Sequence, residues 1–127
     1  MRGSLLTALG ALCLPAAATA AQTPAATVVY APDPLAAAAI QQGDLARAEA
    51  ILTSGRLDAG DPVRLINLGD VYWLSGRHGD AIDAWRRALA SRNHYDVETA
   101  GGRRLSTYDI ASEALAAHGR PVQTAGR

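Results

Sequence analysis

The stretch that decides the fold is LGDVYWLSGRHGDAIDAWRRAL, residues 68–89. Its apolar residues recur at three- and four-residue spacing, which is typical of helices. Gly69 interrupts the first of these helices at a cost of about 1 kcal/mol relative to alanine. That cost is explained if a second helix approaches the backbone there. Ala81 is small enough to permit the approach, and Tyr72 and Trp85 would fill the space around it. The short turn SGRHGD therefore predicts two antiparallel, closely packed helices.

Start and stop signals set the bounds of these helices and reveal two more upstream. Asp61 is a good helix cap, and the proline after it fits the first helical position. Gly43, Gly55 and Gly76 each follow an apolar periodic segment, as expected where helices end. The expected helices cover residues 34–42, 44–54, 62–75 and 79 to about 92.

The pattern of residues 62–95 resembles the tetratricopeptide repeat, a helix-turn-helix unit of about 34 residues. Trp85 stands where the family usually has phenylalanine or tyrosine. Leu65 replaces the usual tryptophan, and Asn93 replaces the proline that ends the second helix, so we expect the chain to turn off the regular path after this repeat. The residues that match the family pattern are Leu68, Gly69, Tyr72, Ala81 and Ala88.

The preceding helices align with this repeat. When Gly43 is set on Gly76, an offset of 33 residues, Ala48 falls on Ala81. Leu52 then falls on Trp85. Residues 34–54 are therefore interpreted as a degenerate first repeat.

A different pattern follows the second repeat. Alternating residues on either side of a glycine-containing turn at residues 100–102 predict a short β-hairpin. Ser106, with Asp109 three residues later, resembles a capping box and opens a last helix that closes at Gly119. Each solenoid repeat exposes an apolar face, so this helix is expected to cap the second repeat. The sequence thus predicts a mainly all-α fold: antiparallel helix pairs of a short tetratricopeptide-like solenoid over residues 34–95, then a β-hairpin and capping helix over residues 96–120.

The ends of the chain show other signals. Arg2, the apolar residues 5–14 and the small residues at 18–20 together predict a cleavable signal peptide over residues 1–20. The apolar run is shorter than the roughly 20 residues that span a membrane. Cleavage after Ala20 or Ala21 predicts a periplasmic or secreted protein without stable membrane insertion. Residues 21–33 are expected to be a disordered linker, and residues 121–127 a disordered tail.

The composition excludes several functions. The chain has 12 basic and 12 acidic residues, so it lacks the electrostatic footprint of a nucleic-acid-binding protein. There is no glycine-rich phosphate loop and no serine in a nucleophile-elbow motif. We therefore expect no catalytic residues, no metal and no cofactor. An alternative is a small metal-dependent enzyme or metal-binding protein, because His94, Asp96 and Glu98 would project from one face of a strand.

The resemblance also implies a binding surface. In tetratricopeptide repeats the first helix of each pair lines a concave groove. Trp73 would be the anchor, since aromatic residues dominate binding hot spots. The first expected helix lacks the basic residues of a carboxylate clamp, so we expect an apolar or mixed segment to bind rather than an acidic C-terminus. The expected binding residues are Val63, Ile66, Asn67, Asp70 and Trp73.

These patterns favour a non-catalytic module or scaffold that binds a protein or peptide partner. A structural repeat protein that self-assembles is a further alternative.

Overall fold

The structure, a computed structural model, describes residues 34–120, which form five helices and one β-hairpin. The expected signal peptide, linker and tail lie outside these residues. None of the described helices is long and apolar enough to cross a membrane. The elements are α1 (Pro34–Gln41), α2 (Leu45–Thr53), α3 (Pro62–Leu74), α4 (His78–Leu89), β1 (Asp96–Glu98), β2 (Arg104–Ser106) and α5 (Thr107–His118).

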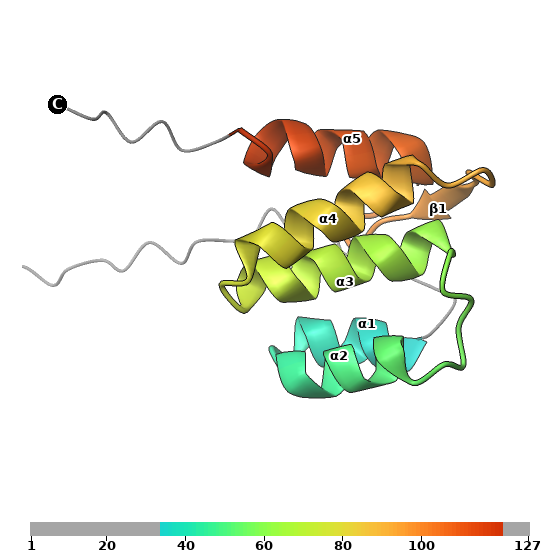
Figure 1. The fold of residues 1–127 in the computed structure, drawn as a ribbon. Coiled ribbons are helices and arrows are strands. Elements are labelled where there is room, and N and C mark those ends of the chain that lie inside the picture. Colours follow the sequence, from blue (N-terminus) through green and yellow to red (C-terminus); the bar gives the residue numbers. More distant parts are fainter. Residues whose placement is uncertain (1–33, 121–127) are drawn as a thin grey trace, which may run out of the picture.

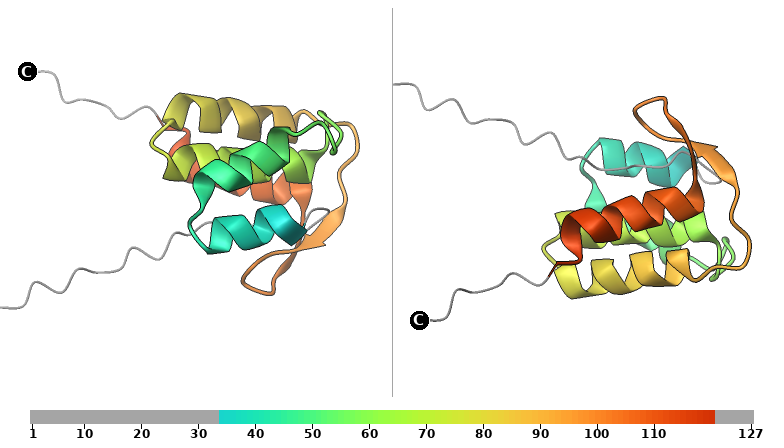
Figure 2. Two further views of the ribbon diagram at one scale, coloured as in Figure 1. Left: turned by 90° about the horizontal axis from the view of Figure 1, so that it is seen from below. Right: turned by 90° about the horizontal axis from the view of Figure 1, so that it is seen from above.

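The helices are stacked in the order of the sequence (Figure 1). The pair of α1 and α2 lies at one end, α3 and α4 pack closely in the middle, and α5 covers α4 at the other end. The hairpin lies at one side of the stack, where the two further views show it connecting α4 to α5 (Figure 2). The predicted mainly helical fold, with a hairpin before a C-terminal helix, is confirmed.

The two helices of each pair are joined by the same kind of turn. Gly43 and Gly76 both have a positive φ, 74° and 79°, a conformation that glycine adopts without strain. The amide of Gly43 donates to the carbonyl of Ile40 and that of Gly76 to the carbonyl of Trp73, both at 3.0 Å. Every one of these residues is offset from its counterpart by the 33 residues found in the sequence. The internal repetition is therefore present in the backbone as well as in the sequence.

The interior residues repeat in the same way. Ala48 and its counterpart Ala81 are fully buried. Leu52 and its counterpart Trp85 are each 1% exposed. The prediction that Gly69 permits a close helix approach is also confirmed, because a Cβ added there would overlap the indole of Trp85. All residues of α3 from Leu65 to Val71 are buried, so α3 is the central helix of the stack.

Helix α4 ends three residues earlier than expected, at Leu89 instead of about Arg92. The carbonyl of Leu89 is engaged by the His94 side chain, whose Nε2 lies 3.2 Å away. The chain leaves the helix there and enters β1. The departure at Asn93 from the family pattern therefore does coincide with a change of path. At its other end, α4 begins at His78, one residue before the expected start.

The hairpin is antiparallel, with Val97 opposite Leu105. Val97 is buried, whereas its neighbours Asp96 and Glu98 are exposed. Ser106 caps α5 as expected, and its hydroxyl accepts from the amide of Tyr108. One face of this short hairpin is thus held against the helices.

Candidate functional site

The face of α3 expected to bind a partner is buried, which corrects the predicted site. Val63 and Ile66 are completely buried, and they pack in one cluster with Val97 of β1 and with Ile110 and Ala111 of α5. The last helix, expected to cap the end of the stack, thus also covers this face, and so does the hairpin. The predicted residues do lie along one helix, but they form part of the core.

The two polar residues of the predicted site are buried too. Asn67 is 3% exposed and Asp70 is 5% exposed. Burial raises the pKa of the Asp70 carboxyl well above its usual value, and the nearby indole N–H of Trp85 opposes that rise. Within the described part of the chain, Asp70 Oδ2 and Trp85 Nε1 form no hydrogen bond of normal geometry with each other or with any other group. Asp70 is therefore an internal acid and cannot contact a partner at the surface.

Trp73, the expected anchor, is only partly exposed and is surrounded by other rings. The centroid of the His78 ring lies 4.0 Å from it and that of the His118 ring 4.1 Å. Trp85 lies further in, at 5.9 Å between centroids. Trp73 thus joins α3 to the start of α4 and the end of α5, and it does not stand free in a groove.

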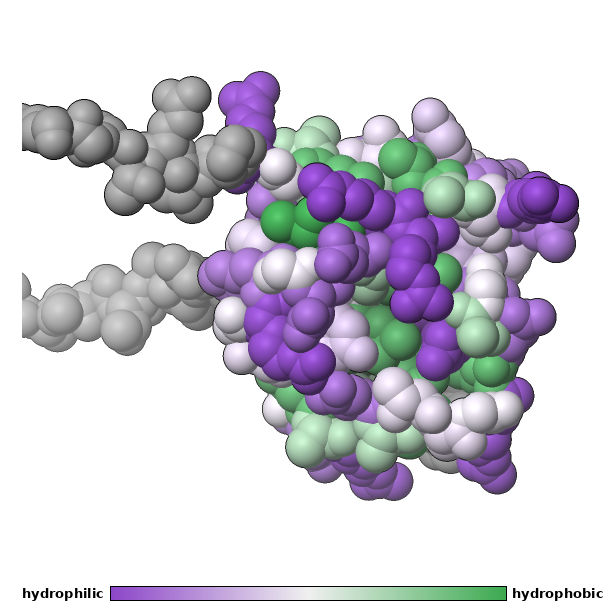
Figure 3. Space-filling model, viewed as in Figure 1, coloured by the Kyte–Doolittle hydropathy of each residue, from purple (hydrophilic) through white to green (hydrophobic). Residues whose placement is uncertain are grey.

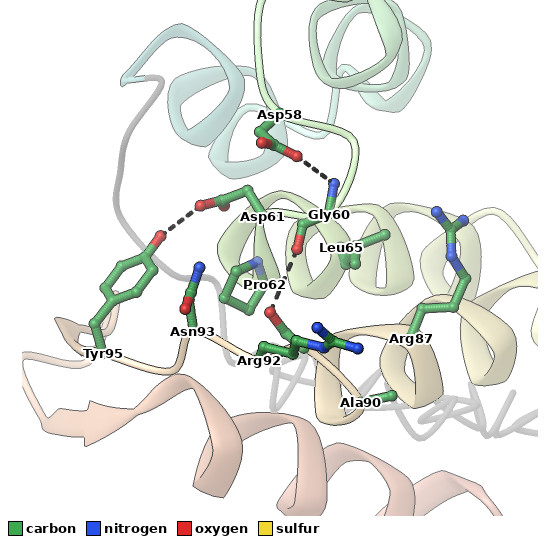
Figure 4. Close-up of a pocket in the computed structure, with 11 residues that line it drawn as sticks. Asp58, Gly60, Asp61, Pro62, Leu65, Arg87, Ala90, Arg92, Asn93 and Tyr95 are labelled. Atoms are coloured by element: carbon green, nitrogen blue, oxygen red, sulfur yellow. Dashed lines mark hydrogen bonds between the residues drawn. The ribbon is translucent and has the colours of Figure 1, made fainter.

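A hollow lies elsewhere, between the turn that precedes α3 and the segment that follows α4 (Figure 4). It has a volume of about 610 Å³. Pro62, Leu65 and Ala90 supply apolar surface, and the remaining wall is polar. The polar lining residues are Asp58, Gly60, Asp61, Arg87, Ser91, Arg92, Asn93 and Tyr95.

A set of hydrogen bonds holds the start of α3 to the segment after α4 at one side of this hollow. Asp61 caps α3 through a 2.9 Å bond from the amide of Arg64, and its second oxygen accepts from the Tyr95 hydroxyl at 2.8 Å (Figure 4). Burial raises the pKa of the Tyr95 phenol, and the Asp61 carboxylate raises it further. The tyrosine thus remains a neutral donor, and it ties the start of α3 to the segment after α4.

Arg64 holds the preceding turn in place. Its Nε donates to the carbonyl of Leu52 at the end of α2, at 2.6 Å, and one terminal nitrogen donates to the carbonyl of Ala59 at 3.1 Å. Asp58 closes the turn by accepting from the amide of Gly60 at 2.7 Å. These bonds satisfy backbone groups that the end of a helix leaves open. They also hold in place the turn before α3, which forms one wall of the hollow.

A second hollow of about 220 Å³ continues from the first along the seam of α3 and α4. The two share Leu65 and Arg87 as lining residues. Leu68, Tyr72 and Ala84 extend the apolar floor, while Arg77, Asp80 and Asp83 form the charged rim. We call the two hollows together the α3–α4 groove. Figure 3 shows this face of the molecule, where apolar residues lie between strongly hydrophilic ones.

An ion-pair network lies at the far end of the groove. Arg77 donates from Nε to Asp80 at 2.8 Å and from Nη1 to Glu49 of α2 at 2.9 Å. Its guanidinium also lies 4.2 Å from the centre of the Tyr72 ring. Hydrogen bonds to Glu49 and Asp80 raise the pKa of Arg77. This arginine links the first helix pair to the second.

The residues of the alternative metal site do not come together. Asp96 and Glu98 are exposed on the hairpin, but His94 is turned toward the core. Its Nδ1 lies 3.0 Å from the hydroxyl of the buried Thr107, and its Nε2 reaches the end of α4. Among residues 34–120, no group of three histidine, cysteine or acidic side chains is placed to hold a metal ion. The role of His94 in this structure is to terminate α4 and anchor α5.

The class that fold and groove define is a small helical domain with a repeated helix pair and a surface groove. Comparisons with protein-family models, with curated proteins and with solved structures each give no match. The resemblance to the tetratricopeptide repeat thus stays a prediction.

Proposed function

We propose that the protein is an exported, non-catalytic interaction module of the tetratricopeptide-like type, which binds a peptide or protein partner in the α3–α4 groove. Repetition of the helix pair, down to its turn, supports the tetratricopeptide-like assignment. Export rests on the signal-peptide pattern of residues 1–20. The interaction role rests on the groove.

The observation that carries this proposal is the continuity of the groove. An apolar floor that runs along two helices between charged rims suits an extended peptide, whose side chains alternate between floor and solvent. The rims contain both signs of charge, as interaction surfaces with polar borders do. The floor belongs to the central helices, so the surface is preformed and a partner binds it without first rearranging the fold.

The proposal can be tested by photo-crosslinking in a native host. A photoreactive amino acid at Ala90, which is exposed and lines the groove, is expected to give a covalent adduct with a partner protein. The matched control is Ala117, an equally small and exposed residue on α5. Adducts from position 90 and none from position 117 would support the groove.

Two other outcomes would contradict the proposal. Equal labelling from both positions would mean that the groove binds a partner no better than the surface of α5 does. An adduct with the mass of two copies of this chain would favour the self-assembling alternative over a different partner.

A further inference from the structure

The charges along the α3–α4 groove are not equally available to a partner. Its acidic residues are already engaged within the chain. Asp61 holds both the amide of Arg64 and the hydroxyl of Tyr95, and Asp58 holds the amide of Gly60. At the other end, Asp80 is bonded to Arg77, and Asp83 lies 3.6 Å from Arg86. A cationic ligand would therefore have to displace existing bonds.

Two arginines of the same groove, by contrast, are not engaged within the chain. Arg87, in the last turn of α4, and Arg92, just beyond it, are both exposed and both line the larger hollow (Figure 4). Neither guanidinium has a hydrogen bond or an ion pair with any residue of the described range. Each guanidinium can bind a carboxylate with two parallel hydrogen bonds. The unused charge of the groove is thus positive.

We infer that the groove selects an acidic segment of a partner protein, with carboxylates at Arg87 and Arg92 and an apolar side chain on the exposed Ala90. Pro62 and Leu65, which are buried, offer only a small part of the floor. This inference rests on the proposed function, because it names the chemistry of the segment that the groove binds. It differs from the expectation of an apolar or mixed segment rather than an acidic C-terminus, which was drawn from the lack of basic residues in the first expected helix.

The complementarity points to another protein rather than to the ends of this chain. Residues 1–33 contain a single acidic side chain, Asp33, and residues 121–127 contain none. The end of α4 carries partial negative charge from the helix dipole. An anion held there consequently needs both guanidiniums, and reversal of either charge is expected to weaken binding strongly.

The test is a selection from a random-peptide display library against the full purified chain. Enriched peptides rich in aspartate and glutamate around an apolar residue are expected. Enrichment of neutral or basic peptides would overturn the inference while leaving the proposed function in place. No enrichment at all would overturn both.

The enriched acidic peptide then becomes the probe for variants, with binding followed by fluorescence anisotropy. Arg87→Glu and Arg92→Glu should each weaken its binding by about tenfold or more, the effect of losing a charge-assisted bond worth roughly 1.5–3 kcal/mol. The matched control is Arg47→Glu, which changes the net charge equally at an exposed arginine of α2 that lines neither hollow and has no side-chain bond in the described range. Raised salt should also weaken the wild-type complex. Equal losses for Arg47→Glu and Arg87→Glu would mean that only net charge matters, and would overturn the inference.

Discussion

The indole of Trp85 lies directly against the backbone of Gly69, so that α3 and α4 touch where the sequence places its one glycine inside α3. Trp85 is 1% exposed and is among the largest fully buried side chains of the described residues. A glycine that costs the helix about 1 kcal/mol in propensity is thereby offset by the burial of a tryptophan. The contact fixes the geometry of the helix pair that forms the floor of the groove.

Gly69→Ala is expected to destabilise the protein, although alanine is the better helix former. The new methyl group would overlap atoms of the Trp85 ring, and overpacking of this kind costs roughly 1–3 kcal/mol. Chemical denaturation measures the change. Gly79→Ala is the control, because a Cβ at Gly79 in α4 meets nothing within 4 Å, and it should leave stability unchanged or slightly raised. Equal effects at the two glycines would show that propensity alone governs both.

Asp70→Asn is expected to stabilise the protein at neutral pH. In the unfolded chain the carboxyl titrates near pH 4, whereas burial raises its pKa in the folded chain. Between these two values the folded chain keeps a proton that the unfolded chain has lost, so the free energy of unfolding falls as pH rises. Asparagine stays neutral throughout, and its advantage should disappear toward about pH 4.

Chemical denaturation of Asp70→Asn and of the wild type, from neutral pH down to about pH 4, tests the prediction. Asp83→Asn, at an exposed position on α4, should keep the pH dependence of the wild type. Parallel curves for Asp70→Asn and the wild type would refute the role given to the buried carboxyl.

Thr107→Val is expected to loosen the junction between α4, the hairpin and α5. The Thr107 hydroxyl is fully buried and lies 3.0 Å from His94 Nδ1 and 3.3 Å from the amide of Tyr95. Valine has the same shape but leaves those groups without a partner, at a cost of about 1–3 kcal/mol. Thermal unfolding measures the loss. Thr53→Val, at an exposed position in α2, should change stability by less than about 0.5 kcal/mol.

Trp73→Ala should lower stability instead of acting on partner binding alone. The ring packs on His78, His118 and Trp85, but it is only partly buried. The loss should therefore fall below the roughly 3–5 kcal/mol typical of a fully buried tryptophan. Leu74→Ala, the next residue and 39% exposed, should have little effect on denaturation. A stability loss no larger than that of Leu74→Ala would restore Trp73 as a candidate surface anchor.

Local signals were enough to predict the helices and their packing. Asp61 and Ser106 cap the helices that they were expected to cap. The small residues at Gly69 and Ala81 identified the close helix pair. Helix caps depend on residues a few positions apart, and the close contact depends on two helices that follow each other in the chain. Both can therefore be predicted from the sequence.

The proposed binding groove was not predictable in the same way. Val63 and Ile66 have the spacing of an open helix face, and only the return of the chain through Val97 and Ile110 covers them. The groove depends on Tyr95 reaching Asp61 across 34 residues. Contacts of that range leave no periodic signal in a single sequence. The sequence also does not show that Arg87 and Arg92 lack a partner, because Asp83 and Asp96 each stand four positions from one of them.

The most direct test of the α3–α4 groove is a map of amide chemical shifts, recorded by NMR, when the peptide recovered by selection is added. The largest changes are expected at residues 58–62 and 87–95, on the two walls of the larger hollow. Val97, Leu105 and Ile110, which cover the opposite face of α3, should change little. Shifts concentrated on the hairpin and α5, with none on those two walls, would contradict the account and return the binding site to the face that this structure closes.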